Sequence, residues 1–350
     1  MKILLLGGTG AMGTHLAELL KDEHQVYITT RKKIQNCDGK TYISGNSKDL
    51  IFLTEILKIH WDVVIDFMVY STNEFKERID LILNNTSHYI FLSSARVFAN
   101  EVKVIVEDSP RLLDVCQDKE YLETDEYALS KARQEDILRK SKFENWTIIR
   151  PYITFSENRL QLGVLEKEEW LYRALKGRSI VFCEEMLDKR TTLTYGLDVA
   201  VCIANLLGLN AAKSNAYNVT VRDFFTWREI LEVYKEIFFK ETRRKLKIVI
   251  LPVEDFLKTK PNNQYQVIND RLYDRIFDNS KIEALEKSVP WTDPKEALKK
   301  CLTQLIKNPE FLSINWQTEV IRDKFSGEIT PLWEIKGNKN KIKYLLKRFL

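Results

Sequence analysis

The sequence is poor in the residues that build disulfide frameworks and metal sites. Its 350 residues include five cysteines and four histidines, and no two cysteines have the Cys-x-x-Cys spacing of a zinc ribbon. Because the cysteines are odd in number and dispersed, a disulfide framework is not expected, and a reducing cytoplasm fits the chain best. The histidines lack the close spacing of a helix-borne metal site, so no metal is expected.

Long apolar runs and a large charge of one sign are also lacking. The first apolar run, at residues 2–6, is interrupted by glycines too soon to be a signal peptide or a membrane span. The formal net charge is only +4, and acidic and basic residues alternate through most of the chain. With 44% hydrophobic and 30% charged residues, the composition is that of an ordinary soluble globular protein with a sizeable core.

The last stretch of the sequence departs from this charge balance. No acidic residue follows Glu334, and cations alternate with apolar residues at roughly helical spacing. The cations are Lys336, Lys339, Lys341, Lys343, Lys347 and Arg348, and the apolar residues are Ile342, Tyr344, Leu345, Leu346, Phe349 and Leu350. Such a helix either adheres to an acidic membrane surface or partner, or packs on its own or a neighbouring subunit. Packing is favoured over peripheral membrane contact through 336–350, because one short helix without lipidation anchors weakly.

What the sequence does contain, from its first residues, is a strand followed by a glycine turn. The run at 2–6 suits a buried parallel strand and leads into Gly7-Gly8-Thr9-Gly10-Ala11-Met12-Gly13, after which 14–20 continues as a helix. The glycines at 7, 10 and 13 would allow a tight turn, close approach of the backbone to a pyrophosphate, and close helix packing. A turn that serves only packing is the alternative, but its place after the first strand favours a nucleotide cofactor at the helix N-terminus.

Strand-like and helix-like segments alternate along the first 150 residues. Strands are expected at 26–30, 41–43, 63–69, 89–93 and 146–149, and helices at 49–59, 73–83 and 125–140. This alternation predicts an α/β fold, a Rossmann-like doubly wound parallel sheet with a smaller C-terminal substrate domain.

We expect two intimately joined parts, without a Pro/Gly-rich linker between them. The NAD(P)-binding Rossmann domain should cover residues 1–155 and be completed by about 190–220. The substrate-binding part should comprise 156–189 and 221–312, and a basic C-terminal extension should follow at 313–350.

A tyrosine and a lysine stand four residues apart in Tyr127-Ala128-Leu129-Ser130-Lys131. Positions four apart share a helix face, so Lys131 can lie beside Tyr127, and its charge favours phenolate over phenol. Tyr127 would then take or return a proton at a carbinol oxygen while hydride passes to or from a nicotinamide. The alternative is that both side chains only face solvent.

Taken in order, these motifs resemble the extended short-chain dehydrogenase/reductase family, in its branch of sugar-nucleotide epimerases, dehydratases and ketoreductases. The resemblance spans nearly the whole chain. Besides the glycine turn and the Tyr-x-x-x-Lys pair, it rests on 89–98, 148–151, 192–200, 216–219, 278–281 and 290–294. It implies that Ser94, at the end of the fifth strand, hydrogen-bonds the reacting oxygen and acts with Tyr127 and Lys131.

The end of the second strand determines which cofactor is expected. An acid about twenty residues after the glycines would hold the ribose hydroxyl of NAD, but Thr30 stands there. Arg31 and Lys32 could clamp a 2′-phosphate, so NADP is favoured over NAD, the alternative being a solvated basic loop. The remaining expected cofactor contacts are Gly7, Thr9, Gly10, Met12, Gly13, Asn46, Met68, Lys131 and Pro151.

The resemblance implies an NADP-dependent epimerase or ketoreductase that acts on a nucleotide-linked sugar. Ala95-Arg96 stands where the family's dehydratases usually carry Asp-Glu, so elimination of water is disfavoured. Arg96 and Arg190 are candidate substrate ligands. The resemblance also implies a homodimer formed through the helices near 74–84 and 121–140.

A non-catalytic NADP-sensing or RNA-binding protein of the same fold is the alternative function. Such relatives often lose the Tyr or the Lys, and this chain keeps both. Nucleic acid is not an expected partner, because the chain lacks the spread of cations and interleaved aromatics of a nucleic-acid groove.

Overall fold

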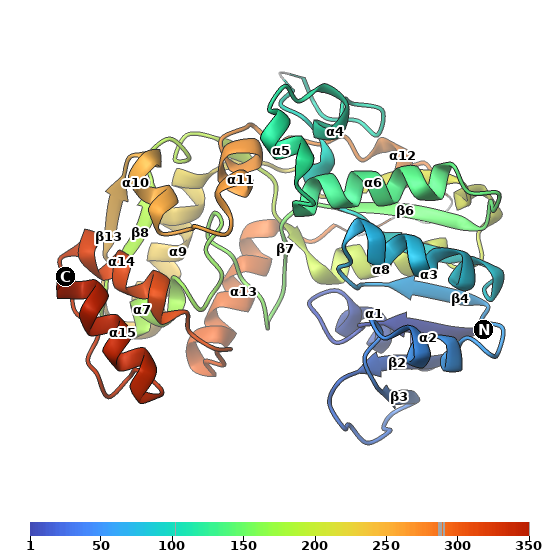
Figure 1. Cartoon of the computed structure of the whole chain (residues 1–350), viewed down its shortest axis with the longest axis horizontal. Helices are drawn as coiled ribbons and strands as arrows, with labels where there is room; N and C mark the ends of the chain where they lie inside the picture. The colour runs from blue at the N-terminus through green and yellow to red at the C-terminus, as the bar shows by residue number, and fades with distance from the viewer. Residues whose placement is uncertain (102, 286–288, 290, 350) are drawn as a thin grey trace. The chain divides into compact units, whose positions relative to one another are not determined.

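The computed structural model describes residues 1–101, 103–285, 289 and 291–349 (Figure 1). Pro290, in one of the late motifs, and Leu350, in the basic end, lie outside these residues. The chain splits into two compact units. The first consists of Met1–Ser156, Thr192–Phe224 and Arg275–Pro294, and the second of Glu157–Thr191, Phe225–Asp274 and Lys295–Leu350.

The first unit is built on a seven-stranded parallel sheet with the order β11-β6-β5-β4-β1-β2-β3. Its strands are β1 (Lys2–Leu6), β2 (Gln25–Thr30), β3 (Lys40–Ser44), β4 (Val63–Asp66), β5 (Tyr89–Leu92), β6 (Trp146–Pro151) and β11 (Asn215–Val219). From β1 the order runs outward in both directions, through β2 on one side and β4 on the other. In such sheets ligands bind outside the carboxyl ends of the strands at this switch point.

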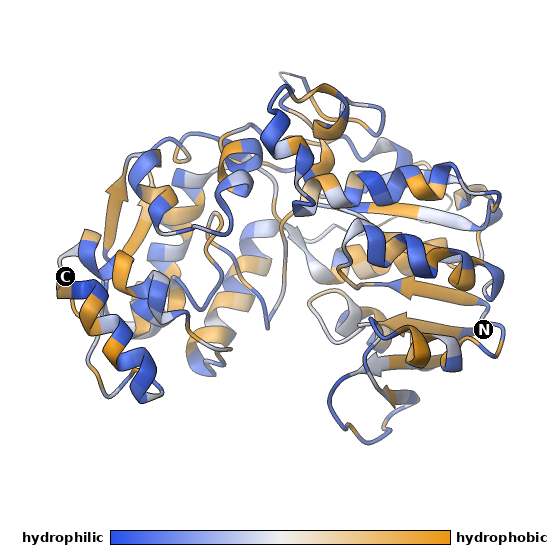
Figure 2. Cartoon of the chain, viewed as in Figure 1, coloured by the Kyte–Doolittle hydropathy of each residue, from blue (hydrophilic) through white to orange (hydrophobic). Residues whose placement is uncertain are grey.

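Helices cover both faces of this sheet, as the apolar side chains of each strand show. On one face, Ile3 and Leu5 pack with α1 (Gly13–Leu20) and α8 (Gly196–Leu206). On the other face, Leu4 and Leu6 belong to a core with α2 (Leu50–Ile56), α3 (Thr72–Asn84) and α6 (Tyr127–Arg139). Strands buried on both faces are largely apolar, as Figure 2 shows for β1 and β4, in which Lys2 and Asp66 are the polar end residues. The predicted doubly wound α/β fold is confirmed.

One strand is shorter than its sequence indicated. The apolar run at 63–69 predicts a strand of that length, but β4 ends at Asp66. The Asp66 carboxylate accepts a hydrogen bond from the Met68 backbone N–H at 2.9 Å, which satisfies this donor locally instead of in the sheet ladder.

Short elements complete the first unit. They are η1 (Ala95–Val97), α4 (Leu112–Val115), α5 (Lys119–Glu123), β7 (Thr154–Phe155), β10 (Thr194–Tyr195), η2 (Asn210–Ala212) and α12 (Ser280–Glu283). Strands β7 and β10 pair in parallel outside the main sheet.

The second unit is mostly helical. Its strands are β8 (Ile180–Cys183), β9 (Arg190–Thr191), β12 (Phe225–Thr226) and β13 (Ile248–Leu251), of which β8 pairs with β13 and β9 with β12. Its helices are α7 (Leu171–Leu175), α9 (Trp227–Thr242), α10 (Val253–Lys258), α11 (Gln264–Gln266), η3 (Val267–Arg271), α13 (Pro294–Lys307), α14 (Trp316–Ser326) and α15 (Asn338–Phe349), the first residue of α13 belonging to the first unit. Within the described residues, no helix is long and apolar enough to cross a membrane.

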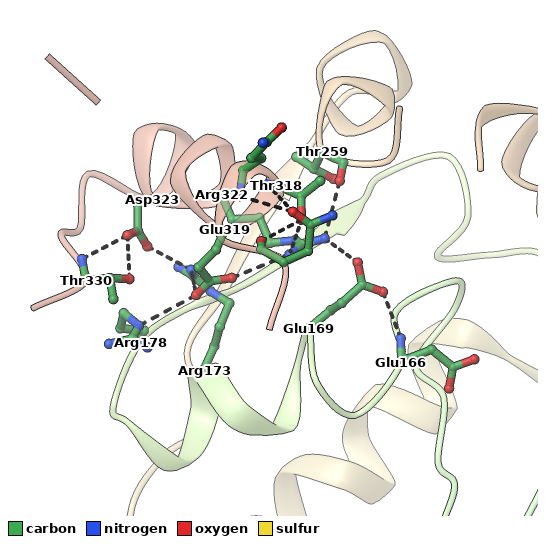
Figure 3. Close-up of polar contacts among 12 residues, drawn as sticks. Glu166, Glu169, Arg173, Arg178, Thr259, Thr318, Glu319, Arg322, Asp323 and Thr330 are labelled. Atoms are coloured by element: carbon green, nitrogen blue, oxygen red, sulfur yellow. Dashed lines mark hydrogen bonds and ion pairs between the residues drawn. The ribbon is translucent and has the colours of Figure 1, made fainter. Parts of the chain in front are cut away.

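A buried network of charges attaches α14 to the rest of the second unit (Figure 3). The fully buried guanidinium of Arg173, on α7, pairs with Glu319 at 2.6 Å and with Asp323 at 2.7 Å, both on α14. Arg322, on the same helix, pairs with Glu169. Burial has removed the hydration of these ions, and their partners now compensate the charges. Removing one partner would therefore leave a buried charge without compensation.

Replacing Arg173 by Met should therefore destabilise the protein by about 3–5 kcal/mol, because Glu319 and Asp323 would keep buried charges without their main partner. Urea unfolding followed by circular dichroism would measure this loss. Arg228→Met is the matched control, since Arg228 pairs with Asp188 at 2.9 Å on the exposed surface, and it should leave stability nearly unchanged. Equal losses in the two variants would contradict the structural role assigned to the buried network.

Candidate cofactor and proton-transfer site

The glycine turn between β1 and α1 uses its glycines in three different ways. Gly7 has φ +72°, and a Cβ there would lie 2.6 Å from the Met68 sulfur. A Cβ on Gly13 would lie 2.5 Å from the Gly8 carbonyl oxygen, so this glycine permits close packing of the turn. A Cβ on Gly10 would meet no atom within 4 Å, which leaves its backbone open to a ligand.

Helix α1 begins beside this open backbone. Its N-cap position, Met12, provides no side-chain hydrogen bond, and its first turn contains no acidic residue. No cap side chain and no first-turn carboxylate therefore competes with an anion for the positive end of the helix dipole. The turn has the features that a dinucleotide pyrophosphate requires.

A cavity of about 610 Å³ adjoins the turn and lies wholly within the first unit. Its size is in the range of small-molecule and cofactor sites. Its walls are Gly7, Thr9, Thr29, Thr30, Arg31, Lys32, Ile34, Gly45, Asn46, Ser47, Lys48, Met68 and Val69. Among these described residues are three cations and no carboxylate, so the cavity favours a negatively charged ligand.

The Thr29 hydroxyl connects three segments of the cavity wall. It accepts hydrogen bonds from the Gly7 N–H at 2.9 Å and from the Ser47 hydroxyl at 2.6 Å, and it donates to the Leu5 carbonyl at 3.4 Å. Sequence reasoning missed Thr29 and Ser47, because their contacts join residues 18–24 positions apart. The only signal was their place beside Thr30 and Asn46.

The predicted cofactor residues at the ends of β2 and β3 lie on this cavity. Thr30 is nearly buried and its hydroxyl accepts a hydrogen bond from the Lys32 N–H at 3.2 Å. Arg31 and Lys32 are exposed at the cavity wall. The Asn46 side chain accepts a hydrogen bond from the Lys48 N–H at 3.2 Å, which shapes the loop after β3.

Lys131 and Tyr127 lie on one face of α6, next to the carboxyl ends of β4 and β5. The buried Lys131 ammonium donates to the Leu92 carbonyl at 2.7 Å and to the Met68 carbonyl at 3.4 Å. It lies 6.0 Å from the centre of the Tyr127 ring. Burial lowers the pKa of Lys131 to about 8, and the negative charges of Asp66 and Glu135 oppose this shift.

Ser94 and Arg96 stand directly after β5. Ser94 is buried, and its hydroxyl accepts a hydrogen bond from the Arg96 N–H at 3.2 Å, so it begins the short helix η1. The Arg96 guanidinium lies 5.1 Å from the centre of the Tyr127 ring and pairs with Glu126 at 2.6 Å. Arg96, expected as a substrate ligand, thus lies beside the expected proton donor and acceptor.

The two remaining predicted residues differ in their positions. Pro151 ends β6 within the first unit. Arg190 lies on β9 in the second unit, where its guanidinium pairs with Asp274 at 2.6 Å and its backbone N–H donates to the same carboxylate at 2.8 Å. The other predicted site residues all belong to the first unit.

A buried ion pair behind the site was also missed from the sequence. Glu135 pairs with Arg150 at 2.6 Å, and both side chains are at most 1% exposed. The Ser93 hydroxyl donates to the same carboxylate. A signal was present, because Glu135 stands four residues after Lys131 on the same helix face.

Comparison with known proteins extends these observations. Residues 3–220, more than half of the chain, match the model of the NAD dependent epimerase/dehydratase family. The chloroplast stem-loop binding protein of 41 kDa b from Arabidopsis thaliana is 27% identical over 245 residues. This match covers 65% of the chain and 60% of the length of that relative.

Solved structures with the same fold have low sequence identity. The NAD+ complex of the enzyme WbmH from Bordetella bronchiseptica has a TM-score of 0.67 at 14% identity, covering 89% of this chain and 100% of that one. UDP-glucuronic acid 4-epimerase from Bacillus cereus, in complex with NAD, has a TM-score of 0.65 at 15% identity, with coverages of 89% and 100%. A UDP-N-acetylglucosamine 4-epimerase from Methanobrevibacter ruminantium M1 gives 0.64 at 16%, with coverages of 87% and 97%.

These structures share the fold of this chain, and the family match covers the strands and helices that form the cavity. The resemblance inferred from the motifs is thereby confirmed. The chain belongs to the NAD dependent epimerase/dehydratase family.

Proposed function

We propose that this chain is an NADP-dependent epimerase or ketoreductase that acts on a nucleotide-linked sugar, with Tyr127 as proton acid and base. The observation that carries this proposal is the position of Lys131. Its buried ammonium contacts the carbonyl of Met68, a residue of the cavity wall, and also lies beside the Tyr127 ring. One cation thus connects the cofactor cavity to the proton-transfer residue.

The residues around Tyr127 favour its ionised form. The Lys131 and Arg96 cations both lie near the ring, and nearby positive charge lowers the cost of forming a phenolate. Ser94 supplies a hydroxyl that would hold the substrate oxygen while Tyr127 takes or returns its proton. When bound, the nicotinamide supplies or accepts the hydride.

The same arrangement argues against elimination of water. Arg96 occupies the position where dehydratases of the family carry an acid, and its guanidinium is paired with Glu126. A guanidinium remains protonated at physiological pH and cannot serve as a general acid or base there. Transfer of hydride and proton at one carbinol carbon is the chemistry that these residues support.

The choice of NADP rests on the cations at the cavity wall. Arg31, Lys32 and Lys48 line it, and Thr30 takes the place of the acid that would bind a ribose hydroxyl. Two exposed cations at the end of β2 suit charge-assisted hydrogen bonds to a 2′-phosphate.

A nucleotide-linked sugar as substrate is supported by relatives of the same fold, among them the two UDP-sugar 4-epimerases. Residues 156–189 and 221–312 would form the substrate-binding part, and Arg190 remains a candidate ligand there. We further propose a homodimer in the cytoplasm, formed through α3 and the segment 121–140.

The Arabidopsis relative favours a second candidate function, binding of a nucleic-acid stem-loop. A labelled RNA stem-loop titrated at low and moderate salt would test it, because phosphate contacts make such affinity fall steeply with salt. Tight, salt-sensitive binding together with no turnover of any nucleotide sugar would favour this function over catalysis.

Tyr127→Phe should reduce turnover by roughly 10²–10⁴-fold, because it removes the proton donor and acceptor without removing the ring. NADP should still stabilise this variant against heat as it does the wild type. The assay is conversion of those UDP-sugars that the wild type turns over. Tyr42→Phe, which removes a phenol hydroxyl elsewhere in the first unit, should keep wild-type turnover. Full activity of Tyr127→Phe would show that the proton is transferred by another group.

The double variant Arg31→Ser/Lys32→Ser should weaken NADP binding at least tenfold and leave NAD binding nearly unchanged, because only NADP carries the 2′-phosphate. Thermal-shift titrations with NADP, NADPH, NAD and NADH would measure both affinities. Lys33→Ser is the control, since Lys33 follows the pair in sequence but is not among the cavity-lining residues. Equal stabilisation of the wild type by NAD and NADP would contradict the proposed 2′-phosphate clamp.

A further inference from the structure

We propose that helix α15 (Asn338–Phe349) binds the chain reversibly to an anionic lipid surface. This proposal does not depend on the proposed catalytic function. It arises from the basic, amphipathic end of the sequence, which the cofactor and proton-transfer site does not use.

The inner side of α15 is centred on Tyr344. This side chain is 1% exposed and packs in an apolar cluster with Trp316, Val320 and Ile335. Its hydroxyl donates to the Asp323 carboxylate and accepts from the Thr330 N–H at 2.8 Å. Tyr344 therefore fixes which side of the helix faces the second unit.

The other large apolar residues of the helix do not share this burial. The exposed fractions of Ile342, Leu345, Leu346 and Phe349 are 59%, 38%, 53% and 65%. At about 100° per residue these four positions fall within about 100° of one another, centred about 150° from Tyr344. They form an apolar stripe that points away from the unit on which the helix packs, and Figure 2 shows the alternation of hydrophobic and hydrophilic residues on α15.

Cations border this stripe on both sides. The same helical geometry places Lys339 and Lys343 along one edge and Lys341 and Arg348 along the other. No acidic residue follows Glu334 in the sequence. The sequence alone favoured packing of these apolar residues on a subunit, but in the structure Tyr344 is the one large apolar side chain of the described helix that is buried.

The charge of α15 and its apolar stripe together indicate which kind of partner the helix binds. A second copy of α15 would bring five further cations against the five that the helix already carries, which is unfavourable. A nucleic acid would satisfy the cations but leave the three aliphatic residues of the stripe facing phosphates and water. Phe349 is the one aromatic residue of the stripe, whereas nucleic-acid surfaces stack successive bases on several aromatic side chains. An anionic bilayer offers phosphates and carboxylates to the cations and the headgroup–acyl boundary to the stripe.

The segment before the helix fits the same partner. Trp333 is 85% exposed and lies five residues before α15, and tryptophan is enriched at the interface between membrane and water. A single helix of this length gives marginal affinity, so the expected binding is reversible and sensitive to salt.

The test is co-sedimentation of the full-length chain with phosphatidylcholine vesicles, with and without phosphatidylserine. Binding is expected to vesicles that contain phosphatidylserine and to fall as NaCl is raised. Lys339→Gln/Lys343→Gln should weaken vesicle binding by on the order of tenfold or more, because each lysine that is removed takes away electrostatic attraction to the anionic headgroups. A tenfold loss of affinity corresponds to about 1.4 kcal/mol. Ile342→Gln/Leu346→Gln should also abolish most binding, and both pairs are exposed, so folding should be unaffected.

The matched control is Leu50→Gln/Ile51→Gln, which removes two exposed apolar residues from α2 and should bind vesicles as the wild type does. Unchanged binding of Ile342→Gln/Leu346→Gln, or no binding of the wild type, would overturn the proposal. So would a dimer, detected by light scattering, that only the α15 variants lose, or binding of an RNA stem-loop by the α15 cations without binding to vesicles. NADP should stabilise the same variants against heat as it does the wild type, because α15 lies outside the cofactor cavity. Vesicle binding is thereby tested independently of the proposed catalytic function.

Discussion

The buried ion pair between Glu135 and Arg150 is the interaction on which the geometry of the site depends. It joins α6, which carries Tyr127 and Lys131, to β6, the second strand from one edge of the sheet. The Arg150 guanidinium also donates to the Glu107 carbonyl at 2.7 Å, and the Ser93 hydroxyl donates to Glu135. Because Lys131 is one helical turn from Glu135, fixing the carboxylate also fixes the ammonium against the end of β5. The pair replaces water with direct partners for both charges, and removing one partner would leave the other buried without compensation.

Asp66 and Lys131 show how burial sets the charge state at the end of β4. Burial raises the pKa of Asp66 to about 6 and lowers that of Lys131 to about 8, and each charge opposes the shift of the other. Between these two values, Asp66 is ionised and Lys131 is protonated, so the opposite charges coexist near neutral pH. The Asp66 carboxylate also orders Met68, whose carbonyl accepts from Lys131 and whose side chain closes the cavity against Gly7. The cavity beside the glycine turn and the residues proposed for proton transfer are therefore connected by one set of polar contacts.

Local patterns in the sequence were sufficient for the fold and for the order of the site motifs. The glycine turn, the alternating strands and the Tyr-x-x-x-Lys spacing each depend on neighbouring residues, so they can be read without tertiary contacts. Pairings between distant segments could not be read in this way. The pairing of Arg190 with Asp274, 84 residues away, is one example. In α15 the amphipathic pattern was clear, but which side is covered depends on Tyr344 contacting Asp323 in α14.

The distribution of positive charge in the first unit explains why the cavity suits a ligand with several phosphates. The N-terminus of α1 supplies partial charge at the glycine turn, where a pyrophosphate would lie. Arg31 and Lys32 supply full charges at the end of β2, on a different wall of the same cavity. Lys48 is partly neutralised by Glu74 at 3.2 Å, whereas no ion-pair partner of Arg31 or Lys32 is found among the described residues. Exposed cations without a partner are strongly hydrated, so they contribute to affinity mainly when a ligand phosphate replaces that water with charge-assisted hydrogen bonds. A ligand with phosphates at two separate positions would engage both of these regions, whereas a ligand with phosphates at one position would engage only one of them.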